Sequence, residues 1–291
     1  MKGIVLAGGK GTRLYPITIP CPKPLLPVYD KPMIYYPIAA LMTAGIREIL
    51  VITPPDCEEL FRQLLGDGSQ FGISISYKPQ PIPRGIADAL ILGEEFIGDD
   101  SVCLALGDNI FDSPGFYIDL KQAIENNTGA TVFGYYVEDP RPFGVVEIGE
   151  DGKAISIEEK PIEPKSHYII PGLYFYDNRV VEIAKNIQPS ARGELEITAV
   201  NNAYLGMGEL SVIKLGPKFC WHDTGTAESM FIASEAIRDI ELKQHRMVGC
   251  LEAIAYLKGF IDRNQLLTAA DSLKMTEYGK SLKRMADLYN I

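Results

Sequence analysis

A glycine-rich segment follows the first apolar run and contains residue types that bind phosphate. The run at 4–7 leads directly into Gly-Gly-Lys-Gly-Thr-Arg at 8–13. Glycines let the backbone approach a ligand closely, and exposed N–H groups can hold phosphate oxygens. Arg13 adds a permanent cation with a forked set of donors. The spacing matches neither a Walker A loop nor the Gly-x-Gly-x-x-Gly dinucleotide fingerprint, so a plain β-α turn stays an open alternative.

A second segment presents one lysine on a stiff loop. Four prolines lie within 20–27, and Lys23 is the only cation among them. Proline fixes the backbone, so this stretch is predicted to be an extended loop. Taken alone, Lys23 fits a solvated side chain as well as a phosphate ligand.

Two aspartates, Asp108 and Asp223, come directly after apolar or aromatic stretches that are predicted strands. A carboxylate at that place either caps the following helix or binds a hard cation. Taken singly, capping is the first interpretation of each. Their pairing favours a metal, because Mg²⁺ takes one or two protein carboxylates plus phosphate oxygens.

The elements that must position these residues alternate through the first half of the chain. The pattern predicts strands at 4–7, 49–53, 73–77, 102–106 and 130–137, and helices at 34–43, 58–65, 86–96 and 119–126. This rhythm predicts a largely parallel sheet with helices on both faces. Ligands of such sheets bind beyond the carboxyl ends of the strands.

The second half of the chain follows a different pattern. We expect a hairpin over 145–148 and 154–158, a strand over 168–176, helices at 180–186 and 197–205, and a strand at 210–215. From Thr226 the chain is predicted to be helical to its end. The economical organisation is an α/β core at 1–225, which includes the hairpin, and a helical appendage at 226–291 packed on it.

Composition excludes several classes of protein. The 291 residues are 46% apolar, and 38 acidic against 28 basic side chains give a net charge of −10. A broad nucleic-acid surface needs clustered cations and is not expected. No apolar run approaches the ~18 residues of a membrane span. The five cysteines have no metal or redox spacing. We expect a reduced, cytoplasmic protein with no membrane partner.

Together, the segments LAGGKGTRL at 6–14 and PKPLLPVYDKPMIYYP at 22–37 resemble the signature of the sugar-1-phosphate nucleotidyltransferases. Further matches look like the glucose-1-phosphate thymidylyltransferases among them: LGDG at 65–68, LGDN at 106–109, FGVVE at 143–147, IEEKP at 157–161, GLYFYD at 172–177, RGELEIT at 192–198 and DTGT at 223–226. The resemblance implies a Rossmann-like fold of the nucleotide-diphospho-sugar transferase type. It also implies Mg²⁺-dependent transfer of a deoxythymidylyl group from dTTP to glucose 1-phosphate, the first step toward dTDP-rhamnose.

The same resemblance implies roles for single residues. Arg13, Lys23 and Asp108 would be catalytic, with Mg²⁺ held by Asp108 and Asp223. The implied nucleotide-binding residues are Leu6, Gly8, Gly9, Gly11, Thr12, Arg13, Lys23, Gln80, Gly85, Asp108 and Asn109. The implied sugar-phosphate-binding residues are Gly144, Glu159, Lys160, Ile170, Gly172, Tyr174 and Arg192. For Arg192, a purely structural role fits the sequence as well as sugar-phosphate binding does.

Departures from the family pattern leave the nucleotide open. Pro22 and Pro24 stand where thymidylyltransferases usually have Ser and Gln, so UTP or another hexose 1-phosphate is an alternative. A non-catalytic regulatory subunit is disfavoured because the phosphate-binding and metal-binding residues are present. An NAD oxidoreductase is disfavoured by the fingerprint spacing. The resemblance also implies a homotetramer, with dTDP-rhamnose as a feedback effector near a subunit interface.

Overall fold

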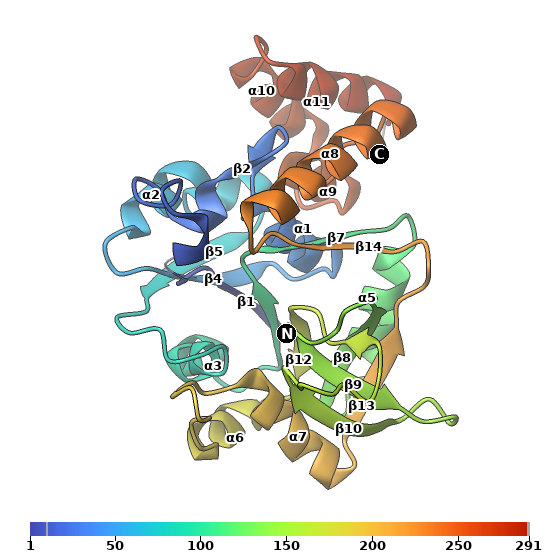
Figure 1. Cartoon of the computed structure of the whole chain (residues 1–291). Coiled ribbons are helices and arrows are strands. Elements are labelled where there is room, and N and C mark those ends of the chain that lie inside the picture. The colour runs from blue at the N-terminus through green and yellow to red at the C-terminus, as the bar shows by residue number, and fades with distance from the viewer. Residues whose placement is uncertain (10, 290–291) are drawn as a thin grey trace.

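A ten-stranded sheet forms the centre of the molecule (Figure 1). The computed structural model describes residues 1–9 and 11–289. The strands are β1 (Lys2–Leu6), β4 (Glu48–Thr53), β5 (Ser74–Pro79), β6 (Val102–Leu106), β8 (Ala130–Tyr136), β9 (Gly144–Ile148), β10 (Ala154–Glu159), β11 (Tyr168–Ile169), β12 (Leu173–Tyr176) and β13 (Leu210–Lys214). Their order is β10-β9-β11-β8-β12-β6-β1-β4-β5, with β13 paired to β8.

Most strands of this sheet run in one direction. β6, β1, β4 and β5 are mutually parallel, and β13 is parallel to β8. Only β10, β11 and β12 run against the others, so seven of the ten strands share one direction. The predicted mostly parallel sheet is confirmed.

Helices cover both faces of the sheet because successive strand residues point to opposite sides. On β1, Val5 belongs to one buried cluster and Ile4 to the other. The first cluster includes residues of α1 (Tyr35–Thr43), α2 (Glu58–Leu65), α5 (Phe116–Glu125) and α9 (Leu251–Leu257). The second includes residues of α3 (Asp88–Leu92), α4 (Glu94–Ile97), α6 (Val180–Asn186) and α7 (Ile197–Met207).

Two predicted elements are divided in the structure. The single helix predicted over 86–96 is α3 followed by α4, and the break falls at Gly93. A Cβ on Gly93 would lie 2.5 Å from Ile4 Cδ1, so glycine permits this close packing on β1. The strand predicted over 168–176 is β11 and β12, separated at Pro171, which has no N–H for the ladder.

Two short ribbons were not predicted. Residues Asn109–Asp112 (β7) pair with Cys220–Asp223 (β14), and Pro27–Val28 (β2) pair with Lys31–Pro32 (β3). Both ribbons are antiparallel and lie apart from the main sheet. The β2–β3 ribbon adjoins Lys23. The β7–β14 ribbon joins Asp223 to the end of β6.

The chain after Thr226 is helical, as predicted, and packs on the α/β core (Figure 1). Its helices are α8 (Ala227–Gln244), α9, α10 (Arg263–Ser272) and α11 (Glu277–Leu288). Thr226 caps α8 by accepting a hydrogen bond from the Ser229 N–H. No helix among the described residues is long and apolar enough to cross a membrane. The division into 1–225 and 226–291 stays our proposal.

A buried ion pair ties the appendage to the β2–β3 ribbon. The side chain of Lys31 is 1% exposed, and its Nζ lies 2.9 Å from Oε1 of Glu241 on α8. Asp30 also contacts this ammonium, and Glu241 accepts a hydrogen bond from the Val248 N–H at 2.8 Å. Burial lowers the pKa of Lys31, but the carboxylates of Asp30 and Glu241 outweigh it and hold that pKa above its ordinary value.

Lys31→Met is expected to lower the free energy of unfolding by about 3–5 kcal/mol, because it leaves carboxylates partly buried without their cation. The raised pKa means that this contribution is complete below the unfolded-state pKa of about 10.4 and is lost only at higher pH. Urea unfolding at neutral pH measures the full effect. Lys243→Met removes an exposed lysine of α8, the helix that carries Glu241, and should cost less than about 1 kcal/mol. Equal losses in the two variants would contradict the role of Lys31.

Candidate active site

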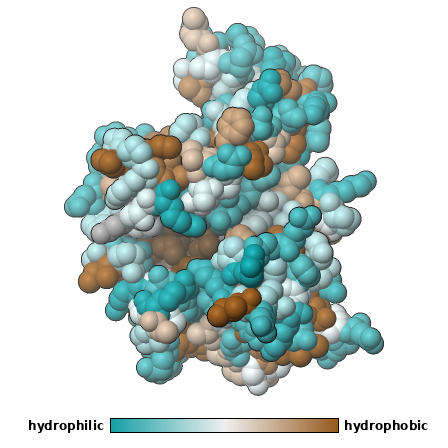
Figure 2. Space-filling model, viewed as in Figure 1, coloured by the Kyte–Doolittle hydropathy of each residue, from teal (hydrophilic) through white to brown (hydrophobic). Residues whose placement is uncertain are grey.

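The candidate site lies where β1 and β6 end on one side of the sheet. Figure 2 shows a hollow with apolar residues at its back, at the level where Figure 1 draws β1. Gly107, which follows β6, donates a hydrogen bond to the Leu6 carbonyl at the end of β1 at 2.9 Å. A Cβ on Gly107 would lie 2.8 Å from that oxygen, so the two strand ends lie in direct contact.

The glycine loop contacts Lys23 and Gln80, two other residues of the predicted nucleotide set. Gly11 has φ of 62°, and its carbonyl accepts a hydrogen bond from Thr18 Oγ1 at 2.7 Å. A Cβ on Gly11 would lie 3.1 Å from Lys23 Cβ, and one on Gly8 would lie 2.4 Å from Gln80 Oε1. Gly8 and Gly11 therefore bring Gln80 and Lys23 against the loop. Lys10 lies outside the described residues.

Four further residues of the predicted nucleotide set lie at this loop, and Gly85 lies against Leu195. Leu6 ends β1 and is half-buried, while Gly9, Thr12 and Arg13 are exposed. Gly85 has φ of 113°, and a Cβ there would lie 2.5 Å from the Leu195 carbonyl oxygen. Only glycine fits that close approach without strain.

Lys23 and Asp108 form a direct ion pair. Lys23 Nζ lies 2.5 Å from Asp108 Oδ2, and the lysine is 7% exposed. Asn109 Nδ2 donates to the other oxygen, Asp108 Oδ1, at 3.0 Å. Burial alone raises the pKa of Asp108, but the Lys23 ammonium and these hydrogen bonds hold it below its ordinary value. Asp108 is therefore a charged group at the end of β6.

The ribbon of β7 and β14 brings Asp223 to the same place. Asp223 pairs with Asn109 in the ladder, one residue beyond Asp108. The next residue, Thr224, is fully buried and donates its N–H and its Oγ1 hydroxyl to the Asp108 carbonyl, at 3.2 and 2.9 Å. The two aspartates, far apart in the sequence, are thus joined through main-chain contacts.

Charges of both signs converge around Asp223. Burial raises the pKa of Asp223, the negative charge of Asp108 raises it further, and Lys23 and Arg13 act against both. A Cβ on Gly225 would lie 2.9 Å from Asp223 Oδ2 and 3.2 Å from Arg13 Nη1. The absence of a side chain at Gly225 lets the Arg13 guanidinium and the Asp223 carboxylate share this space.

The donor set at this point suits a hard divalent cation. Two neighbouring carboxylates, Asp108 and Asp223, offer oxygen ligands, which Mg²⁺ prefers. The described part of the chain contains no group of three or more His, Cys, Asp or Glu side chains arranged for a metal. A cation held here would therefore complete its coordination with ligands that the protein does not supply, such as phosphate oxygens.

A second group of polar residues lies at the end of β10. Glu159 Oε2 accepts a hydrogen bond from Thr198 Oγ1 at 2.5 Å, and Glu159 Oε1 accepts one from Arg192 Nη2 at 3.3 Å. A Cβ on Gly144 would lie 3.4 Å from Glu159 Oε2. Lys160 has φ of 46°, an uncommon conformation for a residue with a side chain. The motif RGELEIT at 192–198 contains Thr198, but the sequence does not reveal Thr198 as a site residue, because its contact with Glu159 forms only in the folded chain.

Arg192 makes its shortest contact with a supporting carboxylate. Its Nη2 lies 2.8 Å from Glu196 Oε1 and 3.6 Å from Glu194 Oε2. Burial lowers the pKa of Arg192, but Glu196, Glu194 and Glu159 outweigh it and hold that pKa above its ordinary value. This ring of carboxylates positions the guanidinium beside Glu159.

The group around Asp108 and the group around Glu159 are connected by Gly172, Tyr174 and Ile170. Gly172 donates its N–H to Asn109 Oδ1 at 3.1 Å, and a Cβ on Gly172 would lie 2.6 Å from Leu106 Cδ1. Ile170 and Tyr174 are 7% and 3% exposed and belong to the second buried cluster. Burial raises the pKa of Tyr174, and the charges of Glu159 and Asp108 raise it further. The charges of Glu159 and Asp108 therefore both act on the Tyr174 hydroxyl.

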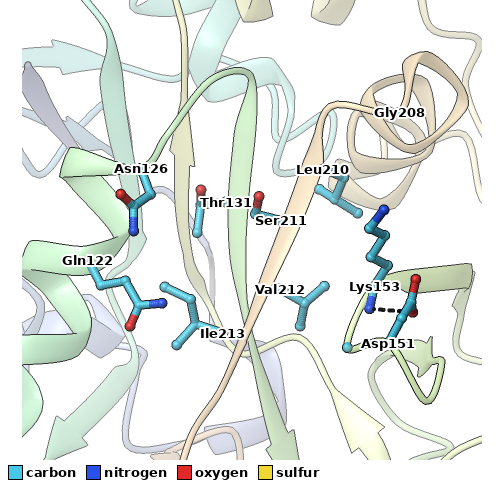
Figure 3. A pocket seen from close by; sticks show the side chains of 11 residues that line it. Gln122, Asn126, Thr131, Asp151, Lys153, Gly208, Leu210, Ser211, Val212 and Ile213 are labelled. Atoms are coloured by element: carbon cyan, nitrogen blue, oxygen red, sulfur yellow. Dashed lines mark hydrogen bonds between the residues drawn. The ribbon is translucent and has the colours of Figure 1, made fainter.

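A separate cavity of about 380 Å³ is lined in part by residues of β13 (Figure 3). Gln122, Asn126, Thr131, Lys153 and Ser211 are among its lining residues. None of the predicted site residues lines it. The hollow at the ends of β1 and β6 therefore remains the candidate active site.

Known proteins resemble this chain in both sequence and structure. Residues 2–240 match the model of a family described as nucleotidyl transferase. A glucose-1-phosphate thymidylyltransferase of Neisseria meningitidis serogroup A / serotype 4A is 56% identical over 285 residues, covering 98% of this chain and 99% of that protein. The enzyme of the same name from Mycolicibacterium smegmatis is 53% identical over 287 residues, covering 99% of each chain.

Solved structures show the same fold. A Bacillus anthracis protein, crystallised in complex with a sucrose, superimposes with a TM-score of 0.76 at 45% identity, covering 82% of this chain and 96% of that one. A UDP-glucose pyrophosphorylase complexed with UDP-glucose superimposes with a TM-score of 0.72 at 24% identity, covering 84% of this chain and 99% of that one.

Proposed function

The chain belongs to the nucleotidyl transferase family, and we propose that it transfers a deoxythymidylyl group from dTTP to glucose 1-phosphate. The products are dTDP-glucose and pyrophosphate, the first step toward dTDP-rhamnose. The observation that carries this proposal is the contact of Lys23 with Asp108 at 2.5 Å, beside Asp223 and the glycine loop. Full-length relatives at 53–56% identity that bear this activity in their names support the choice of substrates.

The reaction needs positioning and charge more than acid–base chemistry. A phosphate oxygen of glucose 1-phosphate attacks the α-phosphorus of dTTP, and the bond from that phosphorus to the β-phosphate oxygen breaks. The attacking oxygen is already an anion, so no general base is required. Phosphoryl transfer of this kind depends on alignment and on stabilising the charge that develops.

Four charged side chains would act on the substrates. Arg13 and Lys23 bind the triphosphate and stabilise the leaving pyrophosphate. Glu159 accepts hydrogen bonds from sugar hydroxyls, while Thr198 fixes its orientation by donating at 2.5 Å. Lys160 binds the sugar phosphate.

Asp108 and Asp223 would hold Mg²⁺. Bound there, the cation neutralises phosphate charge and polarises the α-phosphate. Lys23 keeps the Asp108 carboxylate charged and in place through its contact at 2.5 Å.

We expect dTTP to be the best nucleotide and UTP a measurable second. Thymine and uracil share the same pairing edge, so only the thymine methyl and the 2′-hydroxyl distinguish the two substrates. One methyl in a pocket is worth roughly 10–200-fold in kcat/KM. Competing dTTP against UTP at equal concentration with glucose 1-phosphate, while measuring both sugar nucleotides, tests the assignment. A UTP preference would make the enzyme a uridylyltransferase, and an ATP preference would overturn the base assignment.

We also propose a homotetramer that is inhibited by dTDP-rhamnose. Exposed apolar residues on α8 support self-association: Phe231 and Leu242 are 58% and 53% exposed. The net charge of −10 argues against a nucleic-acid partner, and it is compatible with small anionic substrates held in a local basic pocket.

A further inference from the structure

Gln80 is held by a buried carboxylate that none of the roles above uses. Gln80 Nε2 donates a hydrogen bond to Asp88 Oδ2 at 2.9 Å. Asp88 opens α3 and is 1% exposed, and Gln80 is 3% exposed. The other carboxylate oxygen, Oδ1, accepts a hydrogen bond from Arg84 Nη2 at 2.6 Å. Both oxygens of Asp88 therefore have a donor, and one of these donors is Gln80, which the family resemblance implies to bind the nucleotide.

The chemistry of this contact decides which end of the Gln80 amide is free. A carboxylate can only accept hydrogen bonds, so the amide must turn its NH₂ group toward Asp88. Its carbonyl oxygen, Oε1, then lies on the side of Gly8, where a Cβ would be 2.4 Å away. Within residues 1–9 and 11–289, no group donates a hydrogen bond to Oε1. Gln80 thus offers an acceptor at the glycine loop.

We propose that Asp88 is a positioning residue that selects the nucleobase through Gln80, an inference that rests on the function proposed above. The Oε1 acceptor fits a base that has an N–H on its pairing edge, as thymine and uracil have at N3. Cytosine has an acceptor at N3, so two acceptors would face each other. Arg84 completes the arrangement, because its guanidinium only donates and keeps Asp88 in place.

Asp88→Asn gives a directional test. Arg84 can only donate, so it will hold the carbonyl oxygen of the new amide, which turns the NH₂ of that amide toward Gln80. Gln80 must then rotate to accept, and it presents its own NH₂ to the base. We expect kcat/KM to fall for dTTP and to rise for dCTP, so that their ratio drops by about 10-fold to 100-fold.

The Gln80→Ala background separates positioning from a structural role. If Asp88 acts through Gln80, then Asp88→Asn should change the dTTP/dCTP ratio less than about twofold once the glutamine is absent. Glu58→Gln is the matched control, because Glu58 forms a pair with Arg62 at the same i,i+4 spacing on α2. It should leave the ratio at the wild-type value. Asp88→Ser, whose hydroxyl both donates and accepts, serves if the asparagine variant does not fold, and its dTTP/dCTP ratio should lie below the wild-type value.

Failure of this inference is distinct from failure of the proposed function. A wild-type enzyme that makes dTDP-glucose, with an unchanged dTTP/dCTP ratio in the folded Asp88 variant, would overturn the role of Asp88 alone. An equal drop of the ratio with and without Gln80 would also overturn it. A wild-type enzyme that makes no dTDP-glucose from dTTP and glucose 1-phosphate would overturn the function itself.

Discussion

Asp108→Asn is expected to lower kcat by at least about 100-fold while the protein stays folded. The asparagine has nearly the same shape and can still contact Asn109 Nδ2, which donates to Asp108 Oδ1 at 3.0 Å. It loses the negative charge that pairs with Lys23 and that would hold the cation. The rate of pyrophosphate release at saturating dTTP and glucose 1-phosphate, measured across a range of Mg²⁺ concentrations, reports this loss.

A control for Asp108 is an exposed aspartate that is not among the candidate site residues. Asp139 is exposed and pairs with Arg141 at 2.7 Å. Asp139→Asn should keep the wild-type rate at every Mg²⁺ concentration. If Asp108→Asn also kept its rate at limiting Mg²⁺, the metal assignment would be wrong, and Asp108 would act only through its main-chain and side-chain hydrogen bonds.

Lys23→Met should reduce kcat by about 100-fold at saturating nucleotide, because in the proposed reaction the ammonium contacts charge that grows in the transition state. Methionine keeps a linear apolar side chain in a site that is only 7% exposed, so packing changes little. Steady-state kinetics with dTTP as the varied substrate separate kcat from KM. Lys121→Met, which removes a lysine that is 69% exposed on α5, is the control and should change neither.

The pattern of the Lys23 result decides what the residue does. A fall in kcat and kcat/KM together assigns Lys23 to the transition state. A rise in KM with kcat unchanged would mean that Lys23 binds substrate and transition state equally, and its proposed catalytic role would then be wrong.

The sequence predicted the mostly parallel sheet, but it did not predict how the two proposed metal ligands come together. Asp108 and Asp223 were each placed after a strand from local pattern alone. Their proximity depends on the ribbon of β7 and β14, a pairing between segments far apart in the chain. No local period indicates such a pairing, because four-residue strands are too short to show one.

Residues that position others were the ones that sequence reasoning missed. Asp88 follows Gln80 and Gly85 in the chain and resembles a helix-start carboxylate. Thr198 resembles any helix-start threonine. Their importance lies in contacts with Gln80 and Glu159, which only the folded chain shows. Pro171, by contrast, was a local signal for the break between β11 and β12 that the apolar run around it concealed.

The proposed attack of the sugar phosphate on the α-phosphorus of dTTP is tested most closely by following the oxygen atoms of the sugar phosphate. Purified enzyme would receive dTTP, Mg²⁺ and glucose 1-phosphate whose phosphate carries heavy oxygen, and mass spectrometry would locate the label. Attack on the α-phosphorus predicts dTDP-glucose that retains every labelled oxygen and pyrophosphate that contains none, formed in equal amounts. Label in the pyrophosphate, or no dTDP-glucose at all, would contradict attack by the sugar phosphate on the α-phosphorus of dTTP.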